Sequence, residues 1–390
     1  MKFNPPLFAL AIGAFGIGVT EFSPMGLLPL ISADLGVSIP VAGLLVTAYA
    51  VGVMLGAPVM TLTTGRIPRK NLLIGLMGIF TLGNLLSALS TDYWMLLAAR
   101  LVTSLNHGAF FGVGSVVAAS VVPENKKAGA VATMFMGLTI ANVGGVPLAA
   151  WIGQIAGWRM AFWGITGLGL VAMVALWCAL PRIKADTNIN MRDELRVLRR
   201  PAVLLALTIT VLSSGAMFTV FTYIAPILRD ATHVSTQFIT AMLVLYGLGL
   251  TVGNWLGGRF ADRSVDGTLI AVLIALTLLL VLFAVTMQWP LPAAITIFAW
   301  GMATFALVPP LQMRVMNTAA DAPNVASSIN IGAFNLGNAL GAALGGGVIS
   351  LKLGYPAIAI AGAGLSALGL LLVKGSARGG TSQQNTAARN

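Results

Sequence analysis

The sequence predicts an all-α membrane protein with twelve transmembrane helices in two pseudo-symmetric six-helix bundles. Three observations lead to this prediction: a very apolar composition, twelve apolar stretches of spanning length, and a repeat between the halves of the chain. Hydrophobic residues make up 57% of the 390 residues, and charged residues only 8%. Soluble domains carry about 25% charged residues, so this chain cannot cover a water-facing surface.

A helix that crosses a bilayer needs about 20 mostly apolar residues. Short polar breaks such as "TTGRIPRKN" and "GRFADRSVDG" separate twelve stretches of that kind. The first stretch is too long for the apolar core of a signal peptide and no small-residue cleavage site follows it, so we expect it to remain in the mature protein. The predicted spans are 5–31, 39–63, 72–90, 96–121, 128–152, 160–180, 202–226, 236–257, 268–287, 291–316, 324–350 and 356–374.

One longer polar break, at 181–201, falls at the midpoint of the chain and divides it into two halves. We expect an N-terminal six-helix bundle over 1–180 and a C-terminal six-helix bundle over 202–374. The midpoint break is then a cytoplasmic loop, and 375–390 is a cytoplasmic tail without fixed structure.

The lysines and arginines give the direction of the spans. If the N-terminus is cytoplasmic, 18 of the 22 fall in cytoplasmic segments, whereas three (Arg159, Arg229 and Lys352) fall on the other side and Arg100 lies within a span. This bias follows the positive-inside rule, so both termini are expected in the cytoplasm. The net charge of +11 thus follows from topology and does not indicate nucleic-acid binding. The single cysteine, Cys178, excludes an intrachain disulfide.

An internal repeat relates the halves. "YAVGVMLGAPVMTLTTGR" from residue 49 aligns with "YGLGLTVGNWLGGRFADR" from residue 246, which pairs Tyr49 with Tyr246, and Asn142 pairs with Asn338 at nearly the same offset. Parallel repeats of six helices are typical of some transporter folds. Glycines spaced by four residues also predict faces where helix backbones approach closely. They are Gly249, Gly253 and Gly257, and Gly337, Gly341 and Gly345.

Three ionisable side chains are predicted inside the bilayer. Glu21 is the only acid deep in a span, and Arg100 and His107 lie seven residues apart, on one face of the fourth predicted helix. A charge at the bilayer centre costs about 2.5–3.5 kcal/mol on insertion scales, so such residues indicate a functional cluster. Structural alternatives stay open: Arg100 could snorkel to the surface, His107 could be a neutral link between helices, and Glu21 could be a protonated hydrogen-bond donor.

Amide and aromatic side chains at similar depth are candidates for substrate binding. Most of the amides are expected to join helices, because unpaired polar groups are costly in hydrocarbon, and most of the aromatics to pack in the core. The candidates are Asn106, Phe111, Asn142, Phe218, Tyr223, Gln312, Asn335 and Asn338.

Several of these stretches together resemble one family over almost the whole chain. "TEFSPMGLLP", "RLVTSLNHGAFFG", "ANVGGVPLAAWIG" and "NIGAFNLGNALGAALGG" are similar to signatures of major facilitator superfamily transporters, in the drug:proton antiporter branch that includes arabinose- and sugar-efflux-type permeases. The resemblance implies alternating access between two bundles, a central cavity lined by helices 1, 4, 7 and 10, and a place in the bacterial inner membrane.

The loop between the second and third spans departs from that family. Its usual pattern carries an acid that helps to close the cytoplasmic side, but here Gly65 stands at that position in "TLTTGRIPRK". The second-half copy, "GGRFADR", keeps its acid, so a cytoplasmic latch would take its acid from the second half alone. The resemblance assigns cytoplasmic gating to Arg66, Arg69, Asp262 and Arg263.

The functional expectation is therefore a secondary active transporter that exports small organic molecules (drugs, sugars or metabolites) in exchange for protons. The alternative is a proton-independent facilitator or uniporter of a sugar or nucleoside-like solute, against which Glu21 argues. We find no H-E-x-x-H, G-x-S-x-G or phosphate-binding motif, so we expect neither an enzyme nor an ATP-driven pump. The expected partners are the substrate, protons and the lipid bilayer; we expect a monomer with no metal, cofactor or nucleic acid.

Overall fold

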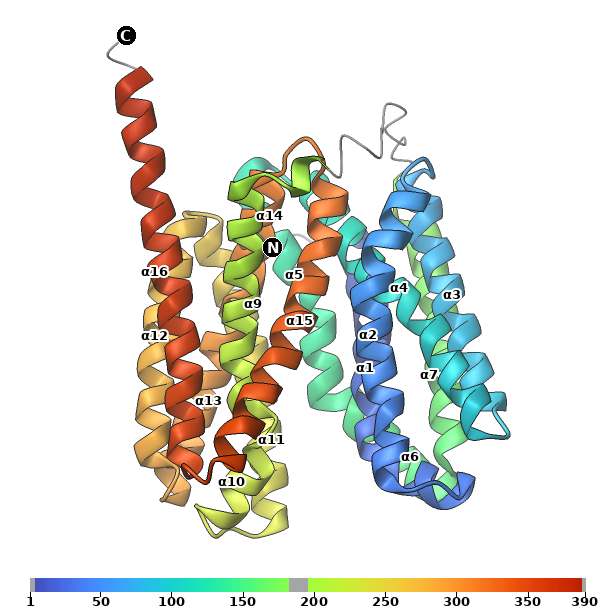
Figure 1. Ribbon diagram of the computed structural model, residues 1–390. Coiled ribbons are helices and arrows are strands. Elements are labelled where there is room, and N and C mark those ends of the chain that lie inside the picture. Colours follow the sequence, from blue (N-terminus) through green and yellow to red (C-terminus); the bar gives the residue numbers. More distant parts are fainter. Residues whose placement is uncertain (1–3, 182–195, 388–390) are drawn as a thin grey trace. The chain divides into compact units, whose positions relative to one another are not determined.

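The computed structural model describes residues 4–181 and 196–387, and all the regular elements in these ranges are helical (Figure 1). Most of the predicted central loop, 181–201, and the last three residues of the chain lie outside the described residues. The helical elements of the described residues, in chain order, are α1 (Pro5–Leu35), α2 (Ile39–Thr64), α3 (Arg69–Leu89), α4 (Tyr93–Ser120), η1 (Glu124–Lys126), α5 (Lys127–Ile140), η2 (Ala141–Gly145), α6 (Val146–Ala156), α7 (Trp158–Ala179), α9 (Pro201–Phe221), α10 (Ile224–Asp230), α11 (Thr236–Ala261), α12 (Val265–Thr286), α13 (Pro290–Ala306), α14 (Val308–Thr318), α15 (Pro323–Ser350) and α16 (Tyr355–Ala387).

Each predicted span coincides with one helix or with consecutive helices, so the all-α membrane fold is confirmed. Eleven helical stretches of the described chain are long and apolar enough to cross a membrane. α15, which covers the eleventh predicted span, has 28 residues but is not one of these stretches, because asparagine, serine and glycine are frequent in it and lower its hydropathy.

Three spans are interrupted, two of them next to prolines that weaken the helical hydrogen-bond ladder. A π-helical turn, η2, separates α5 from α6 just before Pro147, and α13 gives way to α14 just before Pro309 and Pro310. Proline lacks the N–H donor and clashes with the preceding turn, and π-turns are frequent at functional sites. The third break separates α9 from α10 at residues 222–223.

The last helix differs from the sequence expectation. α16 continues to Ala387 and so includes residues 375–387, for which the sequence predicted a tail without fixed structure. The apolar pattern ends near Lys374, but no proline follows that would stop the helix there.

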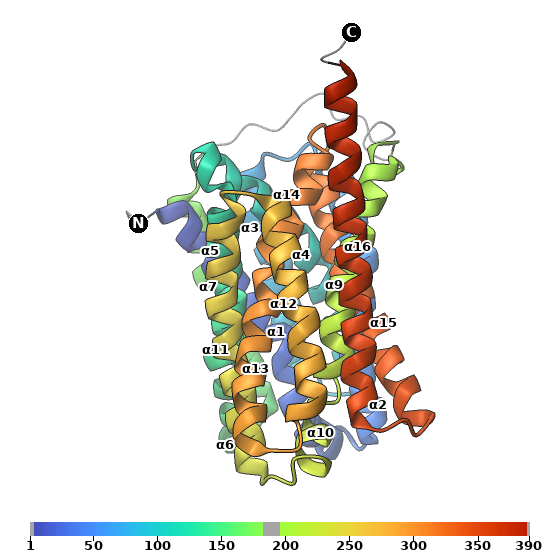
Figure 2. The same cartoon turned by 90° about the vertical axis from the view of Figure 1, so that its left-hand side faces the viewer.

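The chain divides into two compact units. Unit 1 holds residues 1–198 and 319–332, and unit 2 holds 199–318 and 333–390, so α15 contributes to both. In unit 1, α1 contacts α2, α3, α4, α5, α6 and α7 and is therefore the central helix. In unit 2, α12 packs against α13 and α16, α11 against α13, and α9 against α16, as the neighbouring ribbons in Figure 2 show.

The glycine faces predicted from the sequence pack backbone against backbone. A Cβ added at Gly253 would lie 2.0 Å from the Met302 carbonyl oxygen, so α11 and α13 are in direct contact. A Cβ at Gly341 would lie 2.4 Å from the Gly215 carbonyl oxygen, which brings α15 equally close to α9. The small-residue prediction is confirmed for both helix pairs.

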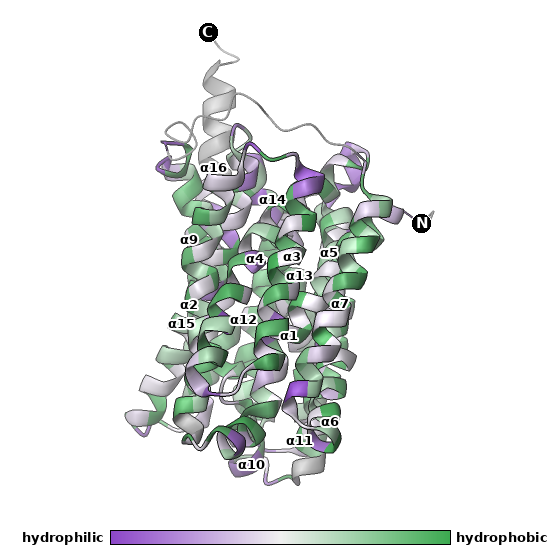
Figure 3. Ribbon diagram, turned by 90° about the vertical axis from the view of Figure 1, so that its right-hand side faces the viewer, coloured by the Kyte–Doolittle hydropathy of each residue, from purple (hydrophilic) through white to green (hydrophobic). Residues whose placement is uncertain are grey.

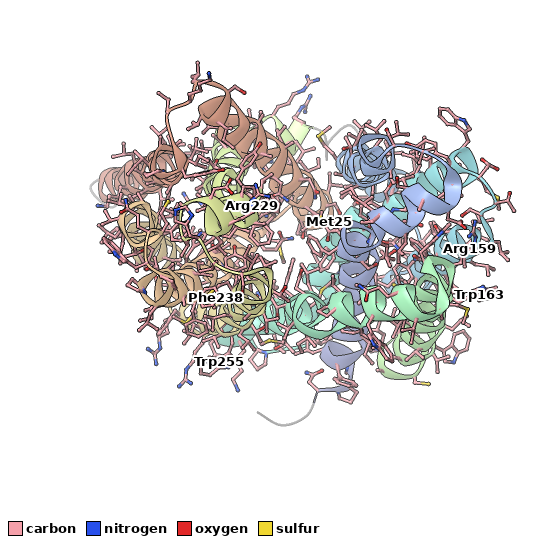
Figure 4. The ribbon with its side chains drawn as sticks, turned by 90° about the horizontal axis from the view of Figure 1, so that it is seen from below. Met25, Arg159, Trp163, Arg229, Phe238 and Trp255 are labelled. Atoms are coloured by element: carbon pink, nitrogen blue, oxygen red, sulfur yellow. The ribbon has the colours of Figure 1, made fainter. Side chains whose placement is uncertain are left out.

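Side-chain polarity follows the expected membrane pattern. Hydrophobic residues extend along the helices and hydrophilic ones gather towards their ends (Figure 3). Large apolar side chains such as Trp177 (70% exposed) and Leu278 (64% exposed) point outward, where lipid would cover them. At one end of unit 1 Arg159, labelled in Figure 4, donates to Asp34 Oδ2 at 2.6 Å and to the Ser90 carbonyl oxygen at 2.9 Å, which joins the ends of α1, α3 and α7.

Candidate functional site

Glu21 lies on α1, the central helix of unit 1. The side chain of Asn4 caps the start of α1 by accepting from the Leu7 amide, and close packing fixes the helix laterally. A Cβ at Gly137 of α5 would lie 2.0 Å from the Ala11 carbonyl oxygen. The side chain of Glu21 is 17% exposed, and its Oε2 lies 4.0 Å from Nδ1 of His107 on α4. The structure thus brings together the carboxylate and the imidazole that the sequence predicted.

Tyr49 of α2 links His107 with Arg100. The Tyr49 hydroxyl oxygen lies 3.2 Å from His107 Nδ1. The guanidinium carbon of Arg100 lies 4.2 Å from the centre of the Tyr49 ring. Arg100 and His107 therefore share the α4 face that meets α2, as their spacing predicted. A cation over a tyrosine face is stabilised by the ring quadrupole, the more so when water is excluded.

Arg100 does not snorkel to the surface. It is 1% exposed, and its Nη1 donates to the Thr20 carbonyl oxygen at 2.8 Å. The Thr20 hydroxyl in turn donates to Asn84 Oδ1 at 2.6 Å, so α1, α3 and α4 together hold the guanidinium. Within the described chain, Arg100 Nε and Nη2 have no hydrogen-bond partner. A buried guanidinium with unused donors is suited to an anionic group.

The cluster of Glu21, Tyr49, Arg100 and His107 (the α1–α2–α4 cluster) combines a carboxylic acid, a phenol, a guanidinium and an imidazole in one water-poor place. These groups can hold, pass or compensate a proton. Tyr49 was not among the site residues predicted from the sequence. The sequence did contain a signal for it. The internal repeat pairs Tyr49 with Tyr246, although the chain has only five tyrosines.

The matching helix pair of unit 2 lacks this chemistry. α2 and α11 start at residues 39 and 236, and α4 and α13 at 93 and 290, so both pairs are offset by 197. At that offset Tyr49 matches Tyr246, but Arg100 and His107 match Ile297 and Thr304. Instead, Tyr246 stacks on Phe221, with ring centroids 4.9 Å apart. The arginine and the histidine of the cluster therefore belong to one half of the repeat, and only the tyrosine is shared.

The other candidates in unit 1 have different surroundings. Phe111 lies beside the cluster, with its ring centroid 5.1 Å from that of His107, and stacks on Phe135 of α5 at 4.8 Å. Asn142, in η2, donates to the Leu138 carbonyl oxygen of its own span at 3.0 Å. Asn106 is fully buried, and neither of its amide atoms has a hydrogen-bond partner among the described residues.

Two of the unit 2 candidates join helices. The Ser214 hydroxyl on α9 hydrogen-bonds to Asn338 Oδ1 on α15, and Tyr223 donates its hydroxyl to the Ala342 carbonyl oxygen at 2.8 Å. Phe218 packs edge-on against Phe221, at a centroid distance of 5.9 Å. Gln312 is buried on α14, and Asn335 is half-buried on α15.

The candidate gating residues lie at helix ends. Arg66 and Arg69 flank the turn between α2 and α3 in unit 1, whereas Asp262 and Arg263 follow the end of α11 in unit 2. Gly65, which replaces the family acid, is the C-cap residue of α2.

Hydroxyl groups hold the first part of α15 within unit 1. Thr61 Oγ1 bonds to Ser328 Oγ at 2.7 Å, and Ser327 Oγ donates to the Gly112 carbonyl oxygen at 2.9 Å. Residues 319–332 are thus tied to α2 and α4 by contacts that do not need an acid at Gly65.

Membrane-spanning helices around a buried cluster of ionisable side chains are typical of membrane transport proteins. Comparisons with known proteins identify the family. The family model of the Major Facilitator Superfamily matches residues 10–342, so the chain belongs to that superfamily. It is a transporter and not an enzyme.

Two relatives and one solved structure are similar over nearly the whole chain. The inner membrane transport protein YdhP of Escherichia coli (strain K12) is 59% identical, over 97% of each chain. A probable sugar efflux transporter of Helicobacter pylori (strain P12) is 32% identical, over 94% of each chain. The crystal structure of the E. coli fucose:proton symporter FucP matches with a TM-score of 0.78 at 14% identity, over 95% of this chain and 98% of that one. This last likeness concerns the fold alone.

Proposed function

We propose that the protein exports small organic molecules in exchange for protons, by alternating access, and that Glu21 carries the proton. The observation that supports this most is the buried α1–α2–α4 cluster, in which the Glu21 carboxylate lies 4.0 Å from His107. The sugar efflux name of a 32% identical relative favours sugars or similarly sized metabolites as substrates. The inner-membrane name of YdhP favours the same membrane here, and the charge bias favours cytoplasmic termini.

Burial supplies the physical basis for proton carriage. Water-poor surroundings favour the neutral carboxylic acid, because the ionised form loses its hydration. Access to water on one side of the membrane stabilises the carboxylate and promotes proton release. Since protonation then depends on which side is open, proton movement and conformational change are linked.

Arg100 compensates the ionised state in this proposal. Its guanidinium belongs to the same buried cluster as Glu21, and its Nε and Nη2 have no hydrogen-bond partner among the described residues. Removing one partner of a buried charge pair leaves the other charge uncompensated, which costs about 3–5 kcal/mol. Protonation of Glu21 therefore changes the balance of charge around Arg100, and an anionic or hydroxyl-rich substrate can take the place of the carboxylate.

The test uses inverted membrane vesicles with an imposed pH gradient. A panel of pentoses, hexoses and cationic dyes is added, and solute-induced proton movement is followed with a pH-sensitive fluorophore between pH 6 and 9. Glu21→Gln mimics the protonated acid, so we expect solute binding without proton exchange. Asp34→Asn is the matched control, because Asp34 is also on α1 but lies at its exposed end in an ion pair with Arg159.

Two results contradict the proposal. Proton exchange by Glu21→Gln at the wild-type rate shows that another group, His107 first, carries the proton. Solutes that equilibrate through the wild-type protein without any proton movement support the proton-independent facilitator instead.

A further inference from the structure

Tyr49 is held against α4 by the packing of α2. A Cβ at Gly52, one turn after Tyr49, would lie 2.0 Å from Ser104 Oγ, and one at Gly108 would lie 3.0 Å from the Ala57 Cα, so α2 packs closely against α4. The side chain of Tyr49 is consequently buried, at 2% exposure. Its position is set by the helix pair and leaves only its hydroxyl free to rotate.

The ring and the hydroxyl of Tyr49 serve different partners. Arg100 occupies the ring face, 4.2 Å from the ring centre, and a guanidinium only donates hydrogen bonds. The hydroxyl lies at Nδ1 of His107 instead, at 3.2 Å. A cation over the ring withdraws electron density from the phenol, which makes its hydroxyl a better hydrogen-bond donor.

His107 Nδ1 faces two competing groups. A neutral imidazole has one N–H donor and one acceptor nitrogen, so a hydroxyl that donates to Nδ1 places the ring proton on Nε2. The same Nδ1 lies 4.0 Å from Glu21 Oε2. While Tyr49 donates to Nδ1, this nitrogen has no lone pair available for a proton from Glu21.

The titratable groups that contact His107 are Glu21 from α1 and Tyr49 from α2. The charged group nearest on its own helix, α4, is Arg100, which lies over the Tyr49 ring. Phe111 adds an uncharged wall beside the imidazole. The choice of partner at Nδ1 is therefore between Tyr49 and Glu21.

We propose that Tyr49 is a positioning residue whose hydroxyl holds His107 in the Nε2–H tautomer and thereby controls when His107 can take the proton of Glu21. This inference rests on the proposed function, because it assigns the transported proton to Glu21. In the step itself, the Tyr49 hydroxyl rotates away from Nδ1, the O–H bond of protonated Glu21 breaks and an N–H bond forms at Nδ1. The products are a carboxylate and an imidazolium. The imidazolium then releases its Nδ1 proton to water, and the Tyr49 hydroxyl donates to Nδ1 again.

The tautomer can be measured on a single histidine. The chain has two histidines, and the other, His233, is exposed in the loop after α10 with a positive φ of 56°. His233→Asn suits this backbone, because asparagine tolerates the left-handed region. The resulting protein, labelled with 15N-histidine in liposomes, gives solid-state NMR signals of the His107 ring nitrogens alone.

We expect the Nε2–H form to dominate in His233→Asn. Adding Tyr49→Phe keeps the ring under Arg100 and removes one hydrogen bond, so the tautomer ratio shifts towards Nδ1–H by about fivefold. The control is Tyr93→Phe, since the Tyr93 hydroxyl also joins α4 to α2, by donating to the Val41 carbonyl oxygen at 2.9 Å, but lies outside the cluster. The control should leave the spectrum unchanged.

The vesicle assay described above provides the second readout. Tyr49→Phe should change the pH profile of solute-induced proton movement, whereas Tyr93→Phe should not. The proposal is overturned if the Nδ1–H tautomer dominates in His233→Asn, or if Tyr49→Phe leaves the His107 spectrum of that protein unchanged. A shifted tautomer with an unchanged pH profile also overturns it, because the tautomer then does not control proton exchange. Failure of the proposed function is a separate result, namely proton exchange by Glu21→Gln.

Discussion

The substitution Gly137→Ala tests whether the position of the proton site depends on close packing between α1 and α5. The added Cβ would lie 2.0 Å from the Ala11 carbonyl oxygen and 2.8 Å from the Phe15 amide nitrogen. Ordinary contact begins at 3.4 Å, so the first distance is short by 1.4 Å. Both obstacles are backbone atoms, which cannot rotate away, and α1 must therefore move relative to α5.

The expected cost follows from two opposing terms. Overpacking a dense interior costs about 1–3 kcal/mol, and a backbone obstacle places Gly137→Ala near the upper value. Alanine in place of glycine within a helix returns about 1 kcal/mol. The net loss in stability should be about 2 kcal/mol. Because α1 carries Glu21, its displacement should also weaken proton exchange.

The measurement is thermal unfolding of the purified protein in detergent, followed by tryptophan fluorescence, together with the vesicle assay. Gly167→Ala on α7 is the control, since nothing lies within 4 Å of its added Cβ, and it should be neutral or slightly stabilising. A Gly137→Ala protein as stable and as active as the wild type refutes the argument that backbone contact between α1 and α5 positions Glu21.

Three further predictions concern other parts of the chain. Gly112→Ala should loosen the first part of α15 from unit 1, because its Cβ would lie 2.6 Å from Ser328 Cα; faster hydrogen exchange at residues 319–332 would show this, and unchanged exchange would contradict it. Arg159→Gln should lower stability by less than about 1 kcal/mol without affecting proton exchange, since its ion pair with Asp34 is partly solvated; a loss of proton exchange at wild-type protein levels would argue against this purely structural role. Reporter fusions after Ser264 and at the C-terminus should report the cytoplasm, and a fusion near Asp34 the other side; a C-terminus on that other side would undo the charge-based topology.

The sequence alone determined the class of the fold and the place of the ionisable residues. Spans can be read along one dimension, because burial in lipid demands long apolar stretches whatever their neighbours are. The cost of a charge in hydrocarbon likewise marked Glu21, Arg100 and His107 without any knowledge of their partners. Glycine spacing predicted which helix faces approach closely, since only small residues permit such contact.

Only the tertiary structure decided which side chains meet. Tyr49 and His107 are 58 residues apart in the chain, and their contact depends on how α2 and α4 are rotated about their axes. The same rotation buries Arg100 against Thr20 instead of letting it snorkel. In unit 2, the packing of α15 against the turn between α9 and α10 likewise gives the Tyr223 hydroxyl an acceptor, the Ala342 carbonyl oxygen. Hydropathy is nearly unchanged by a rotation of a helix about its axis, whereas hydrogen bonds are specific to one rotation, so the sequence predicted the helices and the structure was needed for the site.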